Sequence, residues 1–166
     1  MDRRRPALEP ATMATSVATA RSDLALRAFR QLHHEHYLHY VQLRTDDAGL
    51  APAVAGAVFT ELAVLWPRVL RSANCPAFAW RLLGTHTEKA VRVLPADRQE
   101  RADHLHRLLP ADQADAVLLH QGLRLSAAGA AALMGTAPEA VRASLARARR
   151  AMSHIAAVAA SGLPPR

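Results

Sequence analysis

Two short stretches of the chain carry side chains that could do chemistry. HHEHYLHY, at residues 33–40, brings four histidines close together, and histidine is a common metal ligand. PEAVRASLARARRAM, at residues 138–152, is rich in arginine, which binds phosphate and reads base edges. The first stretch could form a metal site and the second a nucleic-acid interface.

The spacing of the histidines does not favour a metal site. His33 and His36 can approach each other on a helix, but the pattern is not H-E-x-x-H and Glu35 points away from the pair. Cys75 is the only cysteine, so a thiolate zinc site and an intramolecular disulfide are both excluded. His36 falls in an apolar stripe, where a histidine hydrogen-bonded in the core is the usual explanation. We therefore predict no metal.

The sequence also contains neither a Ser, His and Asp set nor a glycine-rich phosphate loop. We predict no catalytic residue, no cofactor and no enzymatic activity. The net charge of +7 and the pI of about 11.1 fit a polyanionic partner, although a bias toward Ala and Arg also raises both values. No apolar run is long enough to span a membrane, and the basic start lacks the apolar core of a signal peptide. We expect a cytoplasmic protein.

The arginine-rich stretch has the pattern of an amphipathic helix. Val141, Leu145, Ala148 and Met152 share one narrow face, and the arginines occupy the remaining arc. Thr136 followed by Glu139 forms a capping-box pattern at the helix start. One side of this helix can pack while the other faces outward.

The residues just before this helix predict a helix-turn-helix. Ser126 is a suitable N-cap, the alanines that follow allow a slim first helix, and Gly135 lies where a helix end requires positive φ. A short helix, a tight glycine turn and a longer basic helix form the motif that inserts its second helix into the major groove. The alternative, that the arginines only complement the helix dipole, explains the last three but not Arg142.

The whole chain is predicted to be all-α, since no segment alternates like a strand. A stripe of Phe29, Leu32, His36, Tyr40 and Leu43 predicts one helix, and a second apolar helix should stop before Pro67. We expect two small helical domains joined by a polar linker. Their boundaries are a disordered N-terminal tail at 1–21, a helical domain at 22–91, the linker at 92–108, a helix-turn-helix domain at 109–158 and a C-terminal tail at 159–166.

Residues 109–152 resemble region 4 of the extracytoplasmic-function sigma factors of bacterial RNA polymerase. The matching features include Leu109-Pro110, Leu118-Leu119, Leu125-Ser126, Gly135 and Arg147-Ala148-Arg149, and they run without a gap. In that family this region reads the promoter −35 element. The resemblance implies −35-like DNA contacts by Thr136, Glu139, Arg142, Ser144, Arg147, Arg149 and Arg150.

The N-terminal helices resemble region 2 of the same family in HYLHYVQLR, VFTELAVLW and AFAWRLLGTH. The resemblance implies −10-like DNA contacts and a polymerase-binding surface. The −10-like residues would be Arg71, Ser72, Asn74, Trp80 and Arg81, and the polymerase-binding residues Val54, Ala57, Phe59, Glu61 and Trp66. At positions 53–59 this chain has largely apolar residues where the family commonly has several polar ones. This difference predicts weaker binding to core polymerase.

Three functions follow from these patterns. The first is a sigma factor that directs RNA polymerase core to promoters, with double-stranded promoter DNA as its second partner. The second is a divergent helix-turn-helix regulator that binds DNA without recruiting polymerase productively, and the third is a helical protein-interaction module. The sequence leaves open whether an anti-sigma factor binds, and it predicts no membrane partner.

Overall fold

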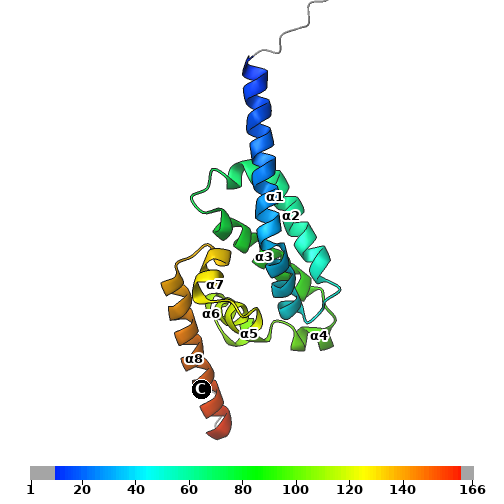
Figure 1. Ribbon diagram of the computed structural model, residues 1–166. Coiled ribbons are helices and arrows are strands. Elements are labelled where there is room, and N and C mark those ends of the chain that lie inside the picture. The colour runs from blue at the N-terminus through cyan, green and yellow to red at the C-terminus, as the bar shows by residue number, and fades with distance from the viewer. Residues whose placement is uncertain (1–9, 162–166) are drawn as a thin grey trace, which may run out of the picture.

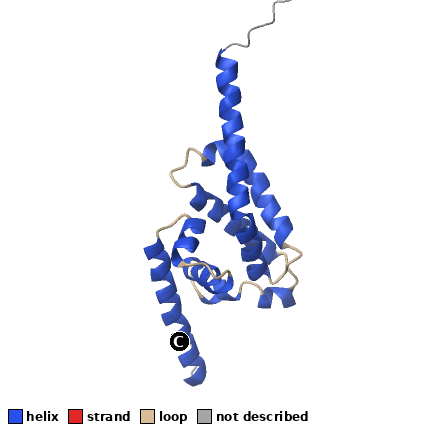
Figure 2. Ribbon diagram, viewed as in Figure 1, coloured by secondary structure: helices blue, strands red, loops and turns tan. Residues whose placement is uncertain are grey.

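The computed structural model describes residues 10–161 and contains only helices and loops over that range (Figures 1 and 2). The prediction of an all-α fold with a C-terminal helix-turn-helix is confirmed. In chain order the helices are α1 (Pro10–Thr45), α2 (Ala51–Val69), α3 (Cys75–Arg92), α4 (Ala96–Arg101), α5 (His104–Leu108), α6 (Ala111–Val117), the π-helical turn η1 (Leu118–Gly122), α7 (Ala127–Met134) and α8 (Pro138–Ser161).

Helices α1, α2 and α3 pack on one another through a core rich in aromatic side chains. Tyr37 and Tyr40 of α1 lie against Trp80 of α3, with ring centroids 6.3 and 4.6 Å away. Trp66 of α2 is also buried, and its Nε1 donates a 2.9 Å hydrogen bond to the Ser22 carbonyl on α1. The chain has few aromatic residues, and several of them lie together in this core.

The buried face of α1 differs from the predicted stripe. His33, Tyr37, Tyr40 and Arg44 are buried, whereas Leu32 is 68 % exposed. Both faces have helical spacing, and the aromatic rings of α2 and α3 select the one that carries Tyr37. The interpretation of His36 as the core histidine was therefore wrong, because the buried histidine of this pair is His33.

Helix α2 continues past the predicted stop before Pro67 and ends at Val69. Pro67 removes one hydrogen bond, to the carbonyl of Ala63, and both residues lie on the exposed side of the helix. Buried Trp66 and Val69 hold the last turn against the core. Packing of Trp66 and Val69 thus keeps residues 67–69 helical, although a proline by itself would end the helix.

The chain termini and the expected linker are more helical than the sequence predicted. Helix α1 begins at Pro10, so residues 10–21 are helical and this end of α1 projects beyond the body, while residues 1–9 lie outside the described part (Figure 1). Helix α8 runs on to Ser161, and the rest of the expected C-terminal tail is not described. The expected linker carries α4 and α5 and buries Leu94 and Ala102.

The two expected domains share part of one core. Leu119, Ala130, Leu133 and Val141 belong to the same apolar cluster as the aromatic residues of the N-terminal helices. A second, smaller cluster of Leu109, Ala114 and Ala148 lies within the C-terminal helices. The domain boundaries themselves stay a prediction.

Candidate nucleic-acid interface

The cap at the start of α7 and the glycine turn at its end have the geometry that the sequence predicted. Ser126 caps α7, because its Oγ accepts a 3.1 Å hydrogen bond from the Gly129 amide. Gly135 ends the helix in the left-handed region, with φ 65° and ψ 42°, which favours glycine. Helix α7 buries Ala130, Ala131 and Leu133, so α8 can lie close across it. Both ends of the short helix are fixed by local chemistry.

Helix α8 packs one face and exposes the other. Val141 and Ala148 are buried and Leu145 is half-buried, as the spacing predicted, whereas Met152 is partly exposed. Arg142, Arg147, Arg149 and Arg150 are all exposed. The outward face of α8 is therefore strongly basic.

Ser144 does not lie on the outward face. It is only 5 % exposed, and its Oγ donates a 2.7 Å hydrogen bond to Asp112 Oδ2 on α6. Arg147 Nη2 donates to the same oxygen at 3.0 Å. The hydrogen bond from Ser144, with help from Arg147, lowers the pKa of Asp112 below its ordinary value, although burial opposes this shift. The helix turns this side chain toward α6 in this conformation, and the DNA contact by Ser144 stays a prediction.

Thr136 in the turn before α8, and Glu139 and Arg142 in the first turns of the helix, are exposed. Arg142 Nη2 donates a 2.6 Å hydrogen bond to Glu139 Oε1, one turn away. Glu139 is thereby directed along the helix surface toward Arg142. Since both side chains are mostly exposed, this ion pair adds little to stability and leaves Arg142 able to change partner.

The residues predicted for −10-like contacts divide into exposed and buried groups. Arg71 and Arg81 are exposed. Asn74 caps α3 by accepting a 3.0 Å hydrogen bond from the Ala77 amide. Trp80, by contrast, is 8 % exposed and its Nε1 donates to Asp115 Oδ2 at 3.1 Å. In this conformation Trp80 cannot contact DNA, because the core and Asp115 cover it.

The remaining −10-like residue, Ser72, is half-buried, and its Oγ donates a 2.6 Å hydrogen bond to the Val69 carbonyl. This bond closes the end of α2. Ser72 therefore lies next to exposed Arg71, and its hydroxyl proton is donated to the Val69 carbonyl.

The residues predicted to bind polymerase also divide into exposed and buried groups. Ala57 and Glu61 are exposed on α2, and Glu61 Oε2 lies 2.7 Å from His86 Nε2. Val54 is half-buried. Phe59 and Trp66 are core residues that expose almost no surface here, and their contact with polymerase stays a prediction. Both aromatic side chains are buried because α2 packs on α1 and α3.

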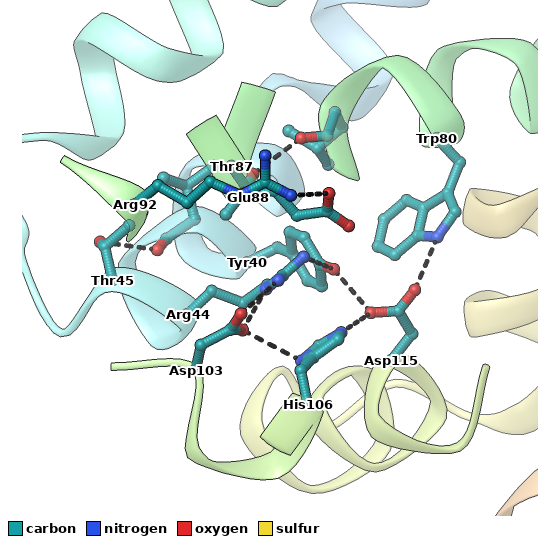
Figure 3. Close-up of polar contacts among 12 residues, drawn as sticks. Tyr40, Arg44, Thr45, Trp80, Thr87, Glu88, Arg92, Asp103, His106 and Asp115 are labelled. Atoms are coloured by element: carbon teal, nitrogen blue, oxygen red, sulfur yellow. Dashed lines mark hydrogen bonds and ion pairs between the residues drawn. The ribbon is translucent and has the colours of Figure 1, made fainter. Parts of the chain in front are cut away.

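A buried polar cluster, which the sequence did not predict, joins the N-terminal helices to the C-terminal block (Figure 3). Asp115 on α6 is its centre. The carboxylate accepts hydrogen bonds from Tyr40 Oη at 2.6 Å and Trp80 Nε1 at 3.1 Å, and it lies 2.8 Å from His106 Nε2. The one signal in the sequence was a carboxylate flanked by Ala114 and Ala116 in an apolar segment.

Arg44 and Asp103 complete this cluster. Arg44 is 3 % exposed and donates two hydrogen bonds to the Asp103 carboxylate. Burial alone would raise the pKa of Asp103, but its polar contacts with His106 and Arg44 hold that pKa well below the usual range. Burial lowers the pKa of His106, yet Asp103 and Asp115 outweigh burial and raise it above the ordinary value. His106 Nδ1 lies 3.2 Å from Asp103 Oδ1, at ion-pair distance but without the alignment of a hydrogen bond. The cluster therefore contains one buried ion pair, Arg44 with Asp103, and a histidine that lies between two carboxylates.

Within residues 10–161, no group of three or more His, Cys, Asp or Glu side chains could hold a metal ion. Burial, with a smaller effect from His36, lowers the pKa of His33 to about 4, so this ring is neutral at pH 7. Over the same part of the chain, none of the helices combines the length and apolarity needed to cross a bilayer.

Comparison with known proteins agrees with the geometry of the C-terminal block. Residues 99–152 match the family model described as Sigma-70, region 4. This range runs from α4 into α8 and includes α7, the turn after it and α8 as far as Met152. A search of curated proteins and a search of solved structures each found no match. The C-terminal block is therefore similar to region 4 of the sigma-70 family, a class of DNA-binding regulatory domain.

Proposed function

We propose that the chain is a transcription initiation factor of the extracytoplasmic-function sigma type, which directs RNA polymerase core to specific promoters from the cytoplasm. In this proposal α8 enters the major groove of a −35-like element. The observation that carries it is the left-handed turn at Gly135, which leads directly into a helix with an exposed arginine face inside the matched region.

The contacts on −35-like DNA follow from position along α8. Arg142 lies one turn into the helix, where side chains of this motif reach base edges. Arg149 and Arg150 lie about two turns further on, where phosphate is the expected partner. Arg147 keeps its bond to Asp112 and holds α8 on α6 while it adds positive charge to the interface.

The N-terminal helices supply the second part of the proposal. Exposed Arg71 and Arg81 are suited to phosphate contacts near a −10-like element, and Asn74 lies between them in the chain. Ala57 and Glu61 present the exposed face of α2 to polymerase core. Because this face carries few polar groups, we expect binding to core to be weaker than is usual for the family.

A second candidate is a regulator that binds DNA without recruiting polymerase productively. The observation that favours it is that Phe59 and Trp66 are buried and the stretch from Ala53 to Val58 offers no carboxylate. Only Glu61 remains as an acidic residue on this helix.

The two candidates are separated by one experiment with two readouts. A preferred duplex is first selected from random DNA with the purified chain, and the chain is then mixed with core polymerase. Co-elution with core together with transcription from a promoter that contains the selected site is the expected result. DNA binding without co-elution would favour the regulator. Absence of both would leave the helical interaction module.

A further inference from the structure

The outward face of α1 carries four large apolar side chains that are exposed. Val17, Leu24, Leu32 and Leu43 are each between 43 % and 68 % exposed. They are spaced 7, 8 and 11 residues apart, close to two, two and three turns of helix, so they form one stripe along α1. Ala28 lies on the same stripe and is also exposed. Single exposed apolar side chains are ordinary on a protein surface, whereas a contiguous set marks an interaction surface.

The N-terminal part of this stripe lies on the end of α1 that projects beyond the body (Figure 1). Residues 16–21 are all exposed, so the body gives this part of the helix little support. A helical segment without tertiary packing is only marginally stable in water. The rest of the stripe runs along the body, where a shallow pocket of about 160 Å³ opens beside Leu32 between α1 and α7.

The stripe is symmetric about Ala28. Leu24 and Leu32 lie four residues to either side of it, and Val17 and His39 lie eleven residues to either side. If two copies of α1 lie antiparallel and cross at Ala28, Leu24 of each copy faces Leu32 of the other. The small alanine at the crossing point allows the two helices to approach closely.

The charges on this face have the same symmetry. Arg21 and Glu35 lie seven residues to either side of Ala28, so Arg21 of each copy would face Glu35 of the other. Both side chains are exposed, and no ion pair within residues 10–161 includes either of them. Opposite charges that face each other across a helix pair favour one orientation and one register.

We propose that this face of α1 is the interface of a homodimer, in which a second copy of the chain packs antiparallel about a twofold axis at the Ala28 pair. A twofold contact of this kind is self-complementary, because the same surface serves both copies. The projecting end of each α1 then lies along the body of the other copy. Leu24 of the second copy comes to the pocket beside Leu32, whose other walls include Leu125, Gly129 and Ala132. The dimer neither requires nor excludes the proposed function.

Sedimentation equilibrium of the full chain tests whether the dimer forms. A contact along one helix pair is small for an interface, so we expect a dissociation constant on the order of 10 µM, within a measured range of about 1–200 µM. Leu32→Gln removes an apolar side chain from the stripe twice per dimer and should raise the dissociation constant about tenfold or more. Val64→Gln is the matched control, because Val64 is an exposed apolar residue on α2 and should leave the constant unchanged.

Charge reversal tests the antiparallel register. Arg21→Glu and Glu35→Arg each place like charges opposite one another twice per dimer, and each should raise the dissociation constant roughly three- to tenfold. The double variant restores opposite charges at both places and should return the constant to that of the unchanged chain. Lys89→Glu makes the same change in net charge as Arg21→Glu at an exposed site on α3, and it should have no effect.

A cysteine at the centre of the stripe tests the twofold symmetry. Cys75 is first replaced by serine, because it is the chain's only cysteine. Ala28→Cys should then form a disulfide between two copies under mild oxidation, since the two residues meet at the axis. Leu24→Cys is the control: its two copies lie eight residues apart along the helix pair, or about 12 Å, which a disulfide cannot bridge.

The proposal is overturned if the chain stays monomeric over the whole concentration range. A dimer that Leu32→Gln does not weaken uses another face and overturns it equally. So does a dimer that the double charge reversal fails to restore, or one in which Leu24→Cys cross-links as readily as Ala28→Cys. Circular dichroism checks that the variants stay folded, and none of the measurements involves DNA or polymerase, so their outcome is independent of the proposed function.

Discussion

Arg44 and Asp103 form a two-pronged ion pair, in which Nε and Nη2 of the guanidinium each lie 2.7 Å from a different carboxylate oxygen. Asp103 adopts a left-handed backbone conformation, with φ 56°, between α4 and α5. Its amide also donates a 2.8 Å hydrogen bond to the Arg44 carbonyl. Side chain and backbone together thus fasten the short helices of residues 96–108 to the end of α1.

Asp103→Asn should lower the free energy of unfolding by about 3 kcal/mol, because it leaves the buried Arg44 charge without its counter-ion. Asparagine tolerates the left-handed conformation, so the backbone is not the cause. Asp46→Asn is the matched control, since Asp46 also has positive φ, at 51°, but makes only an exposed 3.8 Å ion pair with Arg101. In urea denaturation, the free energy of unfolding of this control should change by nearly zero. Equal effects of the two variants would contradict the role of burial.

His106 should make stability depend on pH above neutrality. Its pKa is raised in the folded protein, so it binds a proton more tightly there than in the unfolded chain. The resulting stabilisation is fully present below the unfolded-state pKa of about 6.5 and is lost as the pH rises through the folded-state pKa. The free energy of unfolding should therefore fall as the pH rises above about 6.5. His106→Gln should flatten this decline, and an unchanged slope would contradict the pairing with Asp103 and Asp115.

His33 should act in the opposite direction at lower pH. Its pKa of about 4 lies below the ordinary value of 6.5, so the unfolded chain takes up a proton over this range and the folded chain does not. Stability should fall as the pH drops from about 6.5 to 4, by on the order of 3 kcal/mol. His33→Phe keeps a ring beside Phe29 and Tyr37 and should reduce this acid sensitivity. His39→Gln, at an exposed position, is the control and should change the profile little.

Arg142→Ala and Arg150→Ala should affect DNA binding in different ways under the proposed function. Loss of a base-edge contact by Arg142 should cost about 1–3 kcal/mol of discrimination and weaken the selected duplex much more than random duplex. Loss of a phosphate contact by Arg150 should weaken both alike and lower the salt slope by about 1. Fluorescence anisotropy at several salt concentrations measures both quantities. Unchanged binding by both variants at low salt would mean that the basic face is only solvated.

Gly135→Ala should destabilise the protein, whereas the same change at another helix glycine should not. Alanine at position 135 is strained by the positive φ and by the approach of Ala77. Gly56 lies in the interior of α2 with nothing within 4 Å of an added Cβ, so Gly56→Ala should stabilise by roughly 0.5–1 kcal/mol. Thermal unfolding compares the two. Stabilisation by Gly135→Ala would contradict the close approach of the turn to α3.

Local patterns in the sequence predicted the parts of the structure that local chemistry determines. The cap at Ser126, the turn at Gly135 and the inner face of α8 depend on neighbouring residues, and these predictions are confirmed. The prediction of which face of α1 is buried was wrong, because two faces have helical spacing and only tertiary packing selects between them. The buried polar cluster was missed because its members lie up to 75 residues apart, as Tyr40 and Asp115 do. Sequence spacing carries no information about such pairs.

The exposed side of α8 contains two alanines next to Arg142, at positions 140 and 143. Neither is needed by the core, since Val141 and Ser144 make the inward contacts on this turn. Substitutions at these two positions would therefore change the chemistry offered to a major groove at almost no cost in folding. If α8 reads DNA, related chains could acquire new target sites by single replacements there, while the helix that carries them stays the same.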